Sequence, residues 1–265
     1  MNYFDLKMTK RNIQTRNTQQ RRHGIMQLLQ ERGEISVEQL VQLFDTSEVT
    51  IRKDLSVLQS NGFLLRRYGG AILMPQELLE DAQEDFLSER KLAIAKVAAE
   101  RIRDHNRIII DSGTTTAALI KQLNHKQGLV VMTNSMYVAN ELRSLENEPT
   151  LLMTGGTWDN RSESFQGNVA EQVLRSYNFD QLFIGADGID FERGTTTFNE
   201  LVGLSRVMAE VAREVIVMVE SQKIGRKMPN VELSWQQIDV LITDSLLAEE
   251  SKNCIAAHGV DVICA

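Results

Sequence analysis

The feature that most constrains the fold is a series of short, mostly apolar runs in the later part of the chain. Seven such runs, of three to five residues, alternate with stretches of helical periodicity: 108–110, 129–132, 151–153, 182–184, 215–219, 240–242 and 260–263. Buried parallel strands are apolar along their whole length and are joined by helices, so this alternation is typical of a parallel sheet covered on both faces. The sequence predicts an open α/β domain over residues 88–265, beginning with a helix at 88–103.

The first 75 residues follow a different pattern. Apolar side chains at helical spacing predict three short helices, over 19–29, 36–44 and 47–62. Ser36, with Gln39 three positions later, predicts a capping box at the second helix, and Ser47 is placed to cap the third.

The third predicted helix is followed by a predicted hairpin. Two apolar runs flank Gly69-Gly70, which suggests a tight turn between two strands. In the helix itself we expect four apolar residues to face inward, namely Val49, Ile51, Leu55 and Leu58. Three helices followed by a hairpin make up a winged helix-turn-helix, here over residues 19–75.

Charge divides the chain at the same place. Residues 1–75 carry 11 Lys and Arg against 7 Asp and Glu, a net charge of +4, whereas the remainder carries 18 against 29, or −11. A basic segment attached to an acidic one indicates a polyanionic partner for the first part. We expect residues 1–18 to be a basic, disordered tail or a weak phosphate-contacting arm, and the acidic residues 76–87 to be a linker.

The residues predicted to contact DNA lie on the third helix and the hairpin. A helix can enter a major groove, where Arg pairs with guanine and hydroxyls or Lys reach base edges or phosphates. The candidates on the helix are Ser47, Thr50, Arg52, Lys53 and Ser56, and Arg66 and Arg67 of the hairpin would flank a minor groove. The alternative for Arg52 and Lys53 is a solvent-facing helix with an ion pair to Asp54 or Glu48.

Polar residues follow most of the predicted strands of the second part. Ligands of open α/β sheets bind at the carboxyl ends of strands. After the first strand, amides and hydroxyls at a helix start could form a phosphate cradle from Asp111, Ser112, Gly113, Thr114, Thr115 and Thr116. Further candidates follow the later strands: Asn134, Ser135, Gly155, Gly156, Asp187, Thr195, Thr196 and Lys223.

These residues together favour a site for a small anionic ligand. We expect Asp111 and Asp187 to accept hydrogen bonds from sugar hydroxyls, and Lys223 to pair with the anion. Each loop alone has a structural interpretation, because Ser, Thr and Gly are common turn and cap residues. Five polar loops at successive strand ends are what favours the ligand site.

The motifs of both parts have a known counterpart. Arg21, Ile25, Leu29, Ser47 and the run 50–55 have the spacing of a signature that 68–71 continue. At these positions the chain resembles the DeoR family of bacterial sugar-operon repressors. Segments of the second part are also similar to that family, and most closely to its glucitol-operon repressor branch: 132–135, 155–157, 183–190, 194–200 and 225–227.

The resemblance implies both a fold and a function. The family's effector domain is similar in fold to ribose-5-phosphate isomerase, which implies a phosphorylated sugar, polyol or sugar-acid intermediate as inducer of a repressor. We expect a homo-oligomer, a dimer or tetramer, that places two recognition helices on a palindromic operator. The resemblance does not fix whether the chain represses or activates.

Two other functions are open to a chain of this kind. A sugar-phosphate isomerase-like enzyme needs a poised general base, and we expect Asp187 to lack acidic partners, since Ile184 precedes its Gly-Ala pair and Gly188 follows it. Glu200 cannot be aligned to a catalytic base. The sequence therefore favours a sensor without catalytic residues. A constitutive architectural DNA-binding protein would bind all duplexes alike and would have no use for the acidic part.

Composition excludes several further classes. The chain of 265 residues is 42% hydrophobic, and it has neither a signal-peptide pattern nor an apolar run long enough for a membrane span. We therefore expect a cytoplasmic protein. Cys254 and Cys264 have no metal-type spacing, and we expect neither a metal nor a cofactor.

Overall fold

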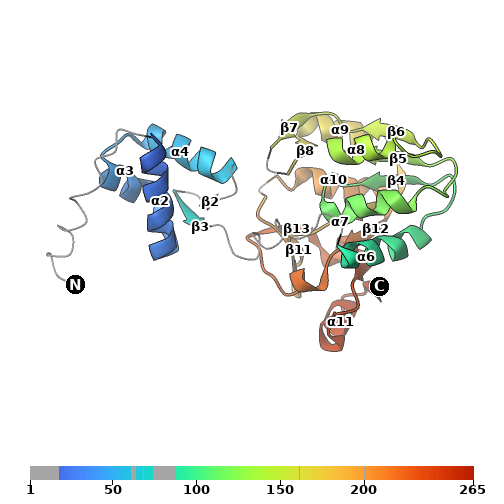
Figure 1. The fold of residues 1–265 in the computed structure, drawn as a ribbon. Coiled ribbons are helices and arrows are strands. Elements are labelled where there is room, and N and C mark those ends of the chain that lie inside the picture. The colour runs from blue at the N-terminus through green and yellow to red at the C-terminus, as the bar shows by residue number, and fades with distance from the viewer. Residues whose placement is uncertain (1–17, 61–63, 68, 74–87, 161, 200) are drawn as a thin grey trace. The chain divides into compact units, whose positions relative to one another are not determined.

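The chain forms two compact units, 1–84 and 85–265, which we call the N-terminal and C-terminal units (Figure 1). The computed structural model describes residues 18–60, 64–67, 69–73, 88–160, 162–199 and 201–265. The predicted tail before Thr18, Tyr68 of the hairpin, the predicted linker 76–87 and Glu200 lie outside the described residues.

The N-terminal unit is a winged helix-turn-helix, as predicted. Its elements are α2 (Thr18–Arg32), β1 (Glu34–Ser36), α3 (Val37–Phe44), α4 (Glu48–Ser60), β2 (Leu64–Arg67) and β3 (Gly70–Leu73). The capping box at α3 is confirmed, because the Ser36 hydroxyl accepts from the Gln39 amide at 3.1 Å and the Gln39 side chain accepts from the Ser36 amide at 3.0 Å. The sequence did not predict β1, which pairs with β3 and extends the hairpin to three antiparallel strands.

The core of the N-terminal unit corrects one prediction about α4. Ile51, Leu55 and Leu58 are buried with residues of α2 and α3, as expected. Val49 does not face inward, because 77% of its surface is exposed. Two residues along an α-helix correspond to a rotation of about 200°, so a side chain two positions before the buried Ile51 faces the opposite side.

The C-terminal unit is built on one parallel sheet. The seven predicted strands are confirmed as β4 (Arg107–Ile110), β5 (Val130–Thr133), β6 (Thr150–Met153), β9 (Phe179–Ile184), β12 (Ala212–Met218), β14 (Val240–Thr243) and β15 (Asp261–Cys264). Their order in the sheet is β15-β14-β12-β9-β4-β5-β6, and neighbouring strands are parallel throughout. The strand order reverses between β4 and β9, where the chain leaves the first half of the sheet and begins the second.

Helices cover both faces of this sheet (Figure 1). In β4, Ile108 and Ile110 belong to one hydrophobic core and Ile109 to the other, because alternate side chains of a strand point to opposite faces. The first core includes residues of α6 (Glu89–Glu100), α7 (Thr114–Ala117), the 3-10 helix η1 (Ala118–Gln122) and α8 (Met136–Leu142). The second includes residues of α9 (Asn168–Arg175), α10 (Gly203–Val211) and α11 (Glu249–Ala256).

Two small sheets were not predicted. A hairpin pairs β7 (Thr157–Asp159) with β8 (Ser164–Gln166), and an antiparallel sheet joins β10 (Gly188–Asp190), β11 (Gly194–Thr197) and β13 (Asn230–Ser234). Residues 195–197 were expected in a polar loop, but they form the buried middle strand of the second sheet. Threonine is β-branched and suits a strand, and its hydroxyl can be buried when a partner is near.

Candidate functional site

The outward face of α4 brings most of the predicted DNA contacts together. Arg52, Lys53 and Ser56 are exposed, on the side opposite the buried stripe. Ser47 caps the helix as predicted: its hydroxyl accepts from the Thr50 amide at 3.2 Å and lies 2.9 Å from the Thr50 hydroxyl. An N-terminal helical turn with exposed cationic and hydroxyl groups is suited to a major groove.

Arg52 has the intrahelical partner that the alternative interpretation proposed. Its Nε donates to Glu48 Oε1 at 2.7 Å, and the two side chains are 48% and 59% exposed. Such an exposed pair one helical turn apart contributes only about 0.3–0.5 kcal/mol to stability. It therefore leaves Arg52 available to exchange this carboxylate for another acceptor.

A buried ion pair fixes α4 against α2. Asp54 is almost fully buried and accepts from Arg21 Nε and from Arg22 Nε, the latter at 2.9 Å. Arg21 is itself buried. Two positions of the sequence signature, 21 and 54, thus have a structural role, because they set the orientation of the helix that carries Arg52 and Lys53.

The hairpin places Arg66 and Arg67 in β2. Arg66 is half-buried and lies opposite Ala71 in the register of β2 with β3. The side chain of Arg67 lies outside the described residues. Contact of this hairpin with a minor groove stays a prediction.

In the C-terminal unit, the candidate ligand site lies where the strand order reverses. Asp111 directly follows β4, and Asp187 comes shortly after the neighbouring strand β9. In open α/β sheets the crevice beyond such a switch point is the usual ligand position, because the connections on either side leave in opposite directions. The topology therefore brings to one edge two candidates that are far apart in the sequence.

Asp111 and Asn134 form the centre of this edge. Asn134 is buried; its Nδ2 donates to Asp111 Oδ1 at 2.8 Å and its Oδ1 accepts from the Ser112 amide at 3.1 Å. The side chain of Asn134 therefore holds the loop after β4 against the end of β5.

The remaining residues of the predicted cradle divide into two groups. Gly113 is exposed and Thr114 half-buried, whereas Thr115 and Thr116 are buried. The Thr116 hydroxyl turns inward and donates to the Asp111 and Gly113 carbonyls at 2.9 and 3.0 Å. Gly113 has a φ of 139°, a backbone conformation that side chains rarely adopt. The outward part of the loop is residues 112–114.

Two candidates after the next strands have structural roles. The buried Ser135 caps α8, accepting from the Val138 amide at 3.4 Å. At Gly156, whose φ is 107°, an added Cβ would lie 2.6 Å from the Gln166 carbonyl oxygen. This glycine thus permits a close approach of the hairpin strand β8, and Gly155 before it also has a positive φ.

The antiparallel sheet adds an acidic residue that the sequence did not indicate. Glu232 in β13 accepts from Ser205 Oγ at 2.7 Å and from Thr195 Oγ1 at 3.4 Å. Asp187 accepts from Thr197 Oγ1 at 2.6 Å. The hydroxyls of β11 thus hold two carboxylates, and they do so from within a strand.

The three carboxylates act on one another. Burial is the main reason that the pKa of Glu232 rises to about 8, and the charges of Asp111 and Asp187 add to the rise. Burial also raises the pKa of Asp111 to about 6, against hydrogen bonds that lower it. The expectation that Asp187 lacks acidic partners is wrong, because both carboxylates lie near enough to feel its charge.

The sequence around Glu232 does not indicate that this residue belongs to a carboxylate cluster with Asp111 and Asp187. It lies between Val231 and Leu233, in the alternation of a short strand, and only the register of β13 with β11 brings it to Thr195. Alternation from Val231 to Leu233 was the one available signal, and it indicates a strand rather than a site.

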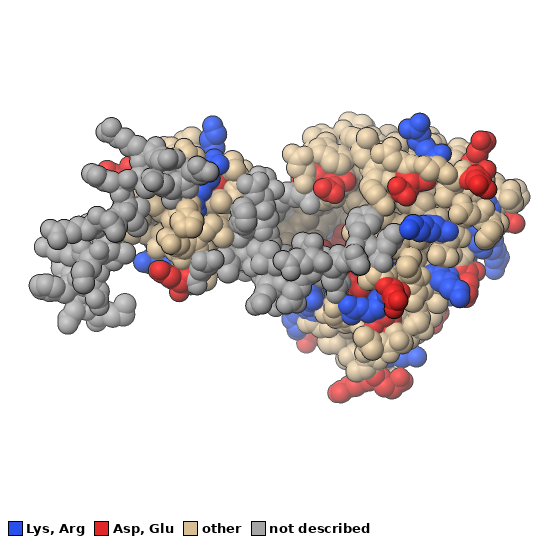
Figure 2. Space-filling model, viewed as in Figure 1, with Lys and Arg blue, Asp and Glu red and all other residues tan. Residues whose placement is uncertain are grey.

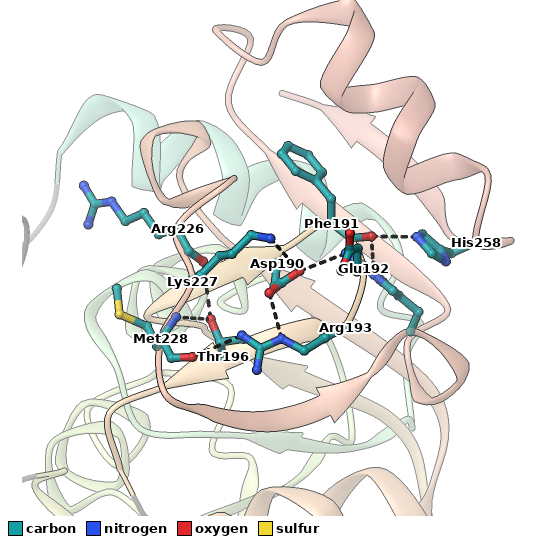
Figure 3. A network of polar contacts seen from close by, with 10 residues as sticks. Asp190, Phe191, Glu192, Arg193, Thr196, Arg226, Lys227, Met228 and His258 are labelled. Atoms are coloured by element: carbon teal, nitrogen blue, oxygen red, sulfur yellow. Dashed lines mark hydrogen bonds and ion pairs between the residues drawn. The ribbon is translucent and has the colours of Figure 1, made fainter.

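Thr196 belongs to a structural network beside the site (Figure 3). Its hydroxyl accepts from the Met228 amide at 3.1 Å, next to a buried Asp190 whose Oδ2 accepts from Arg193 Nε at 2.7 Å. Lys227 Nζ lies 3.9 Å from the other oxygen of Asp190. Burial alone would raise the pKa of Asp190, but these partners and the Glu192 amide hold it below its ordinary value. Asp190 and Lys227 lie in two of the segments that resemble the DeoR family, 183–190 and 225–227. Their contacts thus stabilise the segment 224–228, which follows Lys223.

Lys223 lies in the short helix η2 (Ser221–Lys223), after β12. It is half-buried, at the same edge of the sheet as Asp111 and Asp187. The buried Glu220 just before η2 accepts from Ser88 Oγ at 3.1 Å, and Lys91 Nζ lies 3.8 Å from its other oxygen. This loop is therefore fixed to the first turn of α6, where the C-terminal unit begins.

Charge on the C-terminal unit is spread out. On the face seen in Figure 2, acidic and basic side chains are interspersed. Within the described ranges, no group of three or more His, Cys, Asp and Glu residues is arranged to hold a metal ion. No helix in that same part of the chain is long and apolar enough to cross a membrane.

Comparison with known families defines the class. The model of the DeoR-like helix-turn-helix domain matches residues 21–77, and that of the DeoR C terminal sensor domain matches residues 87–245. A DNA-binding domain joined to a sensor domain is the organisation of a transcriptional regulator. The chain belongs to the DeoR family.

Individual relatives agree with this assignment. A protein of Escherichia coli O157:H7 named putative aga operon transcriptional repressor is 40% identical and is matched over 93% of each chain. The HTH-type transcriptional regulator GlpR of Haloferax volcanii is 33% identical, over 92% of this chain and 96% of its own. Among solved structures, ribose 5-phosphate isomerase A from Methanocaldococcus jannaschii is 19% identical, with 51% of this chain and 53% of that one covered and a TM-score of 0.37. This last likeness is too small to bear on activity or ligand.

Proposed function

We propose that the chain is a sequence-specific DNA-binding repressor of a carbohydrate catabolic operon, relieved by a phosphorylated metabolite. The observation that carries the proposal is the exposed polar face of α4, fixed by the buried Asp54 pair, in a chain of the DeoR family. Because its partner is DNA, we expect the protein to act in the cytoplasm.

The proposed effector is a phosphorylated sugar, polyol or sugar acid at the switch point of the sheet. The backbone amides of Gly113 and Thr114 would hold the phosphate, because the Ser112 amide already donates to Asn134, and Lys223 would add a positive charge. Asp111 and Asp187 would accept from hydroxyl groups. The sequence's likeness to the glucitol-operon repressor favours a polyol phosphate, whereas the name of a relative refers to the aga operon, so tests need several classes of ester.

The proposed mechanism couples the two sites through a homo-oligomer on a palindromic operator. Effector at Lys223 would shift the loop that Glu220 ties to the start of α6, close in sequence to the linker from the N-terminal unit. A state with bound effector would then hold its two α4 helices at a spacing that fits the operator poorly. Such coupling requires that the effector bind one state more tightly than the other.

A gel-shift assay on the DNA upstream of the gene and its neighbours tests the proposal. We expect a specific complex at moderate salt that one member of a panel of phosphorylated sugars, polyols and sugar acids dissociates. Equal affinity for all duplexes would instead indicate an architectural DNA-binding protein. No complex with any fragment would refute the proposal.

Lys223→Ala tests the effector site. The variant should bind operator as the unchanged chain does and should lose the response to the effector. Lys96→Ala is a matched control, because Lys96 is exposed in the middle of α6 and away from the strand ends. An unchanged response in Lys223→Ala would remove this lysine from the site.

The carboxylate cluster favours an isomerase-like enzyme as the second candidate. A carboxyl with a raised pKa beside other charged groups is a common feature of catalytic sites. We nevertheless propose that the chain is not an enzyme, since its relatives are named as regulators. Incubation with ribose 5-phosphate and related esters decides between the two: turnover that Asp187→Ala abolishes would establish the enzyme.

A further inference from the structure

The outward face of α4 contains one apolar residue among its polar ones. Val49, Arg52, Lys53 and Ser56 are spaced three, four and seven positions apart, so they lie on one side of the helix, and all four are exposed. Val49 is 77% exposed, more than any other large hydrophobic side chain in the part of the chain that the structure describes. It occupies the first turn of α4 (Glu48–Ser60).

The N-terminal unit does not require valine at this position. Its core takes Ile51, Leu55 and Leu58 from α4, and these three side chains are at most 5% exposed. A β-branched residue also lowers helix propensity slightly, so local structure does not favour it. Isolated exposed apolar residues are common on protein surfaces, and what distinguishes Val49 is its position on the face with Arg52 and Lys53.

A major groove offers one apolar group to such a side chain. The donors and acceptors of the base edges pair with Arg, Lys and hydroxyls, whereas the C5-methyl group of thymine is recognised by apolar contact. In helix-turn-helix proteins the N-terminal residues of the recognition helix are those that reach base edges. We propose that Val49 contacts a thymine methyl group and specifies one T·A pair in each half of the operator. This inference rests on the proposed role of α4 in reading DNA.

The test begins with a duplex that the unchanged chain selects from a random pool. Each thymine of that duplex is then replaced in turn by deoxyuridine, which removes only the methyl group. We expect one position in each half-site where the replacement weakens binding by about fourfold, the equivalent of losing one buried methyl group. No such position would overturn the proposal.

Val49→Ala completes a double-mutant cycle. This variant removes the contact from both half-sites, so it should bind the thymine duplex about sixteenfold more weakly, and a deoxyuridine replacement should then have little further effect. Full, additive loss from both changes would overturn the proposal, because the methyl group would then be read by another residue. The exposed side chain of Val49 contributes nothing to the core, so the variant is expected to fold, which circular dichroism checks. Leu246→Ala is the matched control, an exposed apolar residue of the C-terminal unit.

The failure of this inference can be told from that of the proposed function. If Arg52→Ala loses specific binding while Val49→Ala does not, α4 reads the operator without Val49 and only the inference fails. If the random pool yields no preferred sequence, the proposed function itself fails. A second selection with Val49→Ala should return the same site with a relaxed preference at the one T·A position.

Discussion

The outward face of α4 comes from a single stretch of ten residues, whereas the polar groups at the switch point come from segments as distant as Asp111, Asp187 and Glu232. In the helix, side chains such as Arg52 and Lys53 are exposed and depend on one buried ion pair for their orientation. At the switch point, nearly every candidate already has a partner: Asn134 with Asp111, Thr197 with Asp187 and the hydroxyls around Glu232.

Because of this difference, substitutions at the two sites should have different effects. A substitution on the outward face of α4 should remove one contact and leave the fold unchanged, because these side chains are in water. A substitution among the carboxylates changes a connected set of charges, so its effect should depend on pH and extend to stability.

Asp54→Ala should have the largest effect. It leaves Arg21 buried without its carboxylate, and breaking a buried ion pair in this way costs about 3–5 kcal/mol. A single core of this size rarely supplies more than about 3–5 kcal/mol of stability, so the N-terminal unit should be largely unfolded at 37 °C. Urea denaturation followed by circular dichroism measures the loss.

The control for Asp54→Ala is the outward face itself. Lys53→Ala lies next to it in sequence but is exposed, so its free energy of unfolding should change by less than about 0.5 kcal/mol. Equal destabilisation by the two variants would show that α4 is not oriented by the buried pair.

Glu232→Gln should stabilise the C-terminal unit at high pH. The folded-state pKa of Glu232 is raised from 4.5 to about 8. The resulting cost is therefore absent below pH 4.5, grows between the two values and is complete above pH 8. Each pKa unit corresponds to about 1.4 kcal/mol, but the side chain of Glu232 is only half-buried, which reduces the total, so we expect a gain of about 2–3 kcal/mol at pH 9. Urea denaturation at pH 5 and at pH 9 measures it.

The comparison between the two pH values is the decisive part of that experiment. At pH 5, only half a unit above the ordinary pKa of a glutamate, little of this cost has accumulated, so the variant should gain less than about 1 kcal/mol. A gain of the same size at both values would mean that the substitution acts through packing. Glu210→Gln is a suitable control, because Glu210 is exposed in α10.

What could be predicted from the sequence follows the same division. The helices, the caps at Ser36 and Ser47, and the seven strands of the sheet each depend on residues close in sequence, and each is confirmed. Val49 was placed inward because it is apolar, although helical geometry already sets it opposite Ile51. The prediction relied on the apolar character of the side chain, whereas its place on the helix indicates the exposed side correctly.

The switch-point site could be predicted only in part. Loops after strands are visible in a sequence, so Asp111, Asn134 and Asp187 were found as candidates. The antiparallel sheet depends on pairing between distant short strands, which local patterns do not reveal. For that reason residues 195–197 were expected in a loop, and Glu232 was missed together with its effect on Asp111.

Arg52→Ala should act on binding and leave stability unchanged. An arginine that pairs with guanine contributes about 1–3 kcal/mol to discrimination, so the variant should lose that much operator affinity and relax the base preference at one position. Arg66→Ala should instead weaken binding to all sequences and reduce the slope of log affinity against log salt by about one. Fluorescence anisotropy over a range of salt concentrations, on the selected and a scrambled duplex, measures both. Intact specific binding in Arg52→Ala would show that α4 is not the reading helix.

Glu48→Ala should have the smallest effect and tests the state of Arg52 before DNA binds. The pair between them is exposed, so its loss should change the free energy of unfolding by only about 0.3–0.5 kcal/mol. Removing a negative charge from the face that meets phosphates should raise affinity for any duplex at low salt, and the gain should disappear as salt screens it. Glu38→Ala, an exposed acidic residue in the first turn of α3, is the control and should gain less. Weaker binding in Glu48→Ala would instead mean that this carboxylate contacts a base or orients Arg52 on the operator. The side chains on the outward face of α4 would then depend on one another, as those at the switch point do.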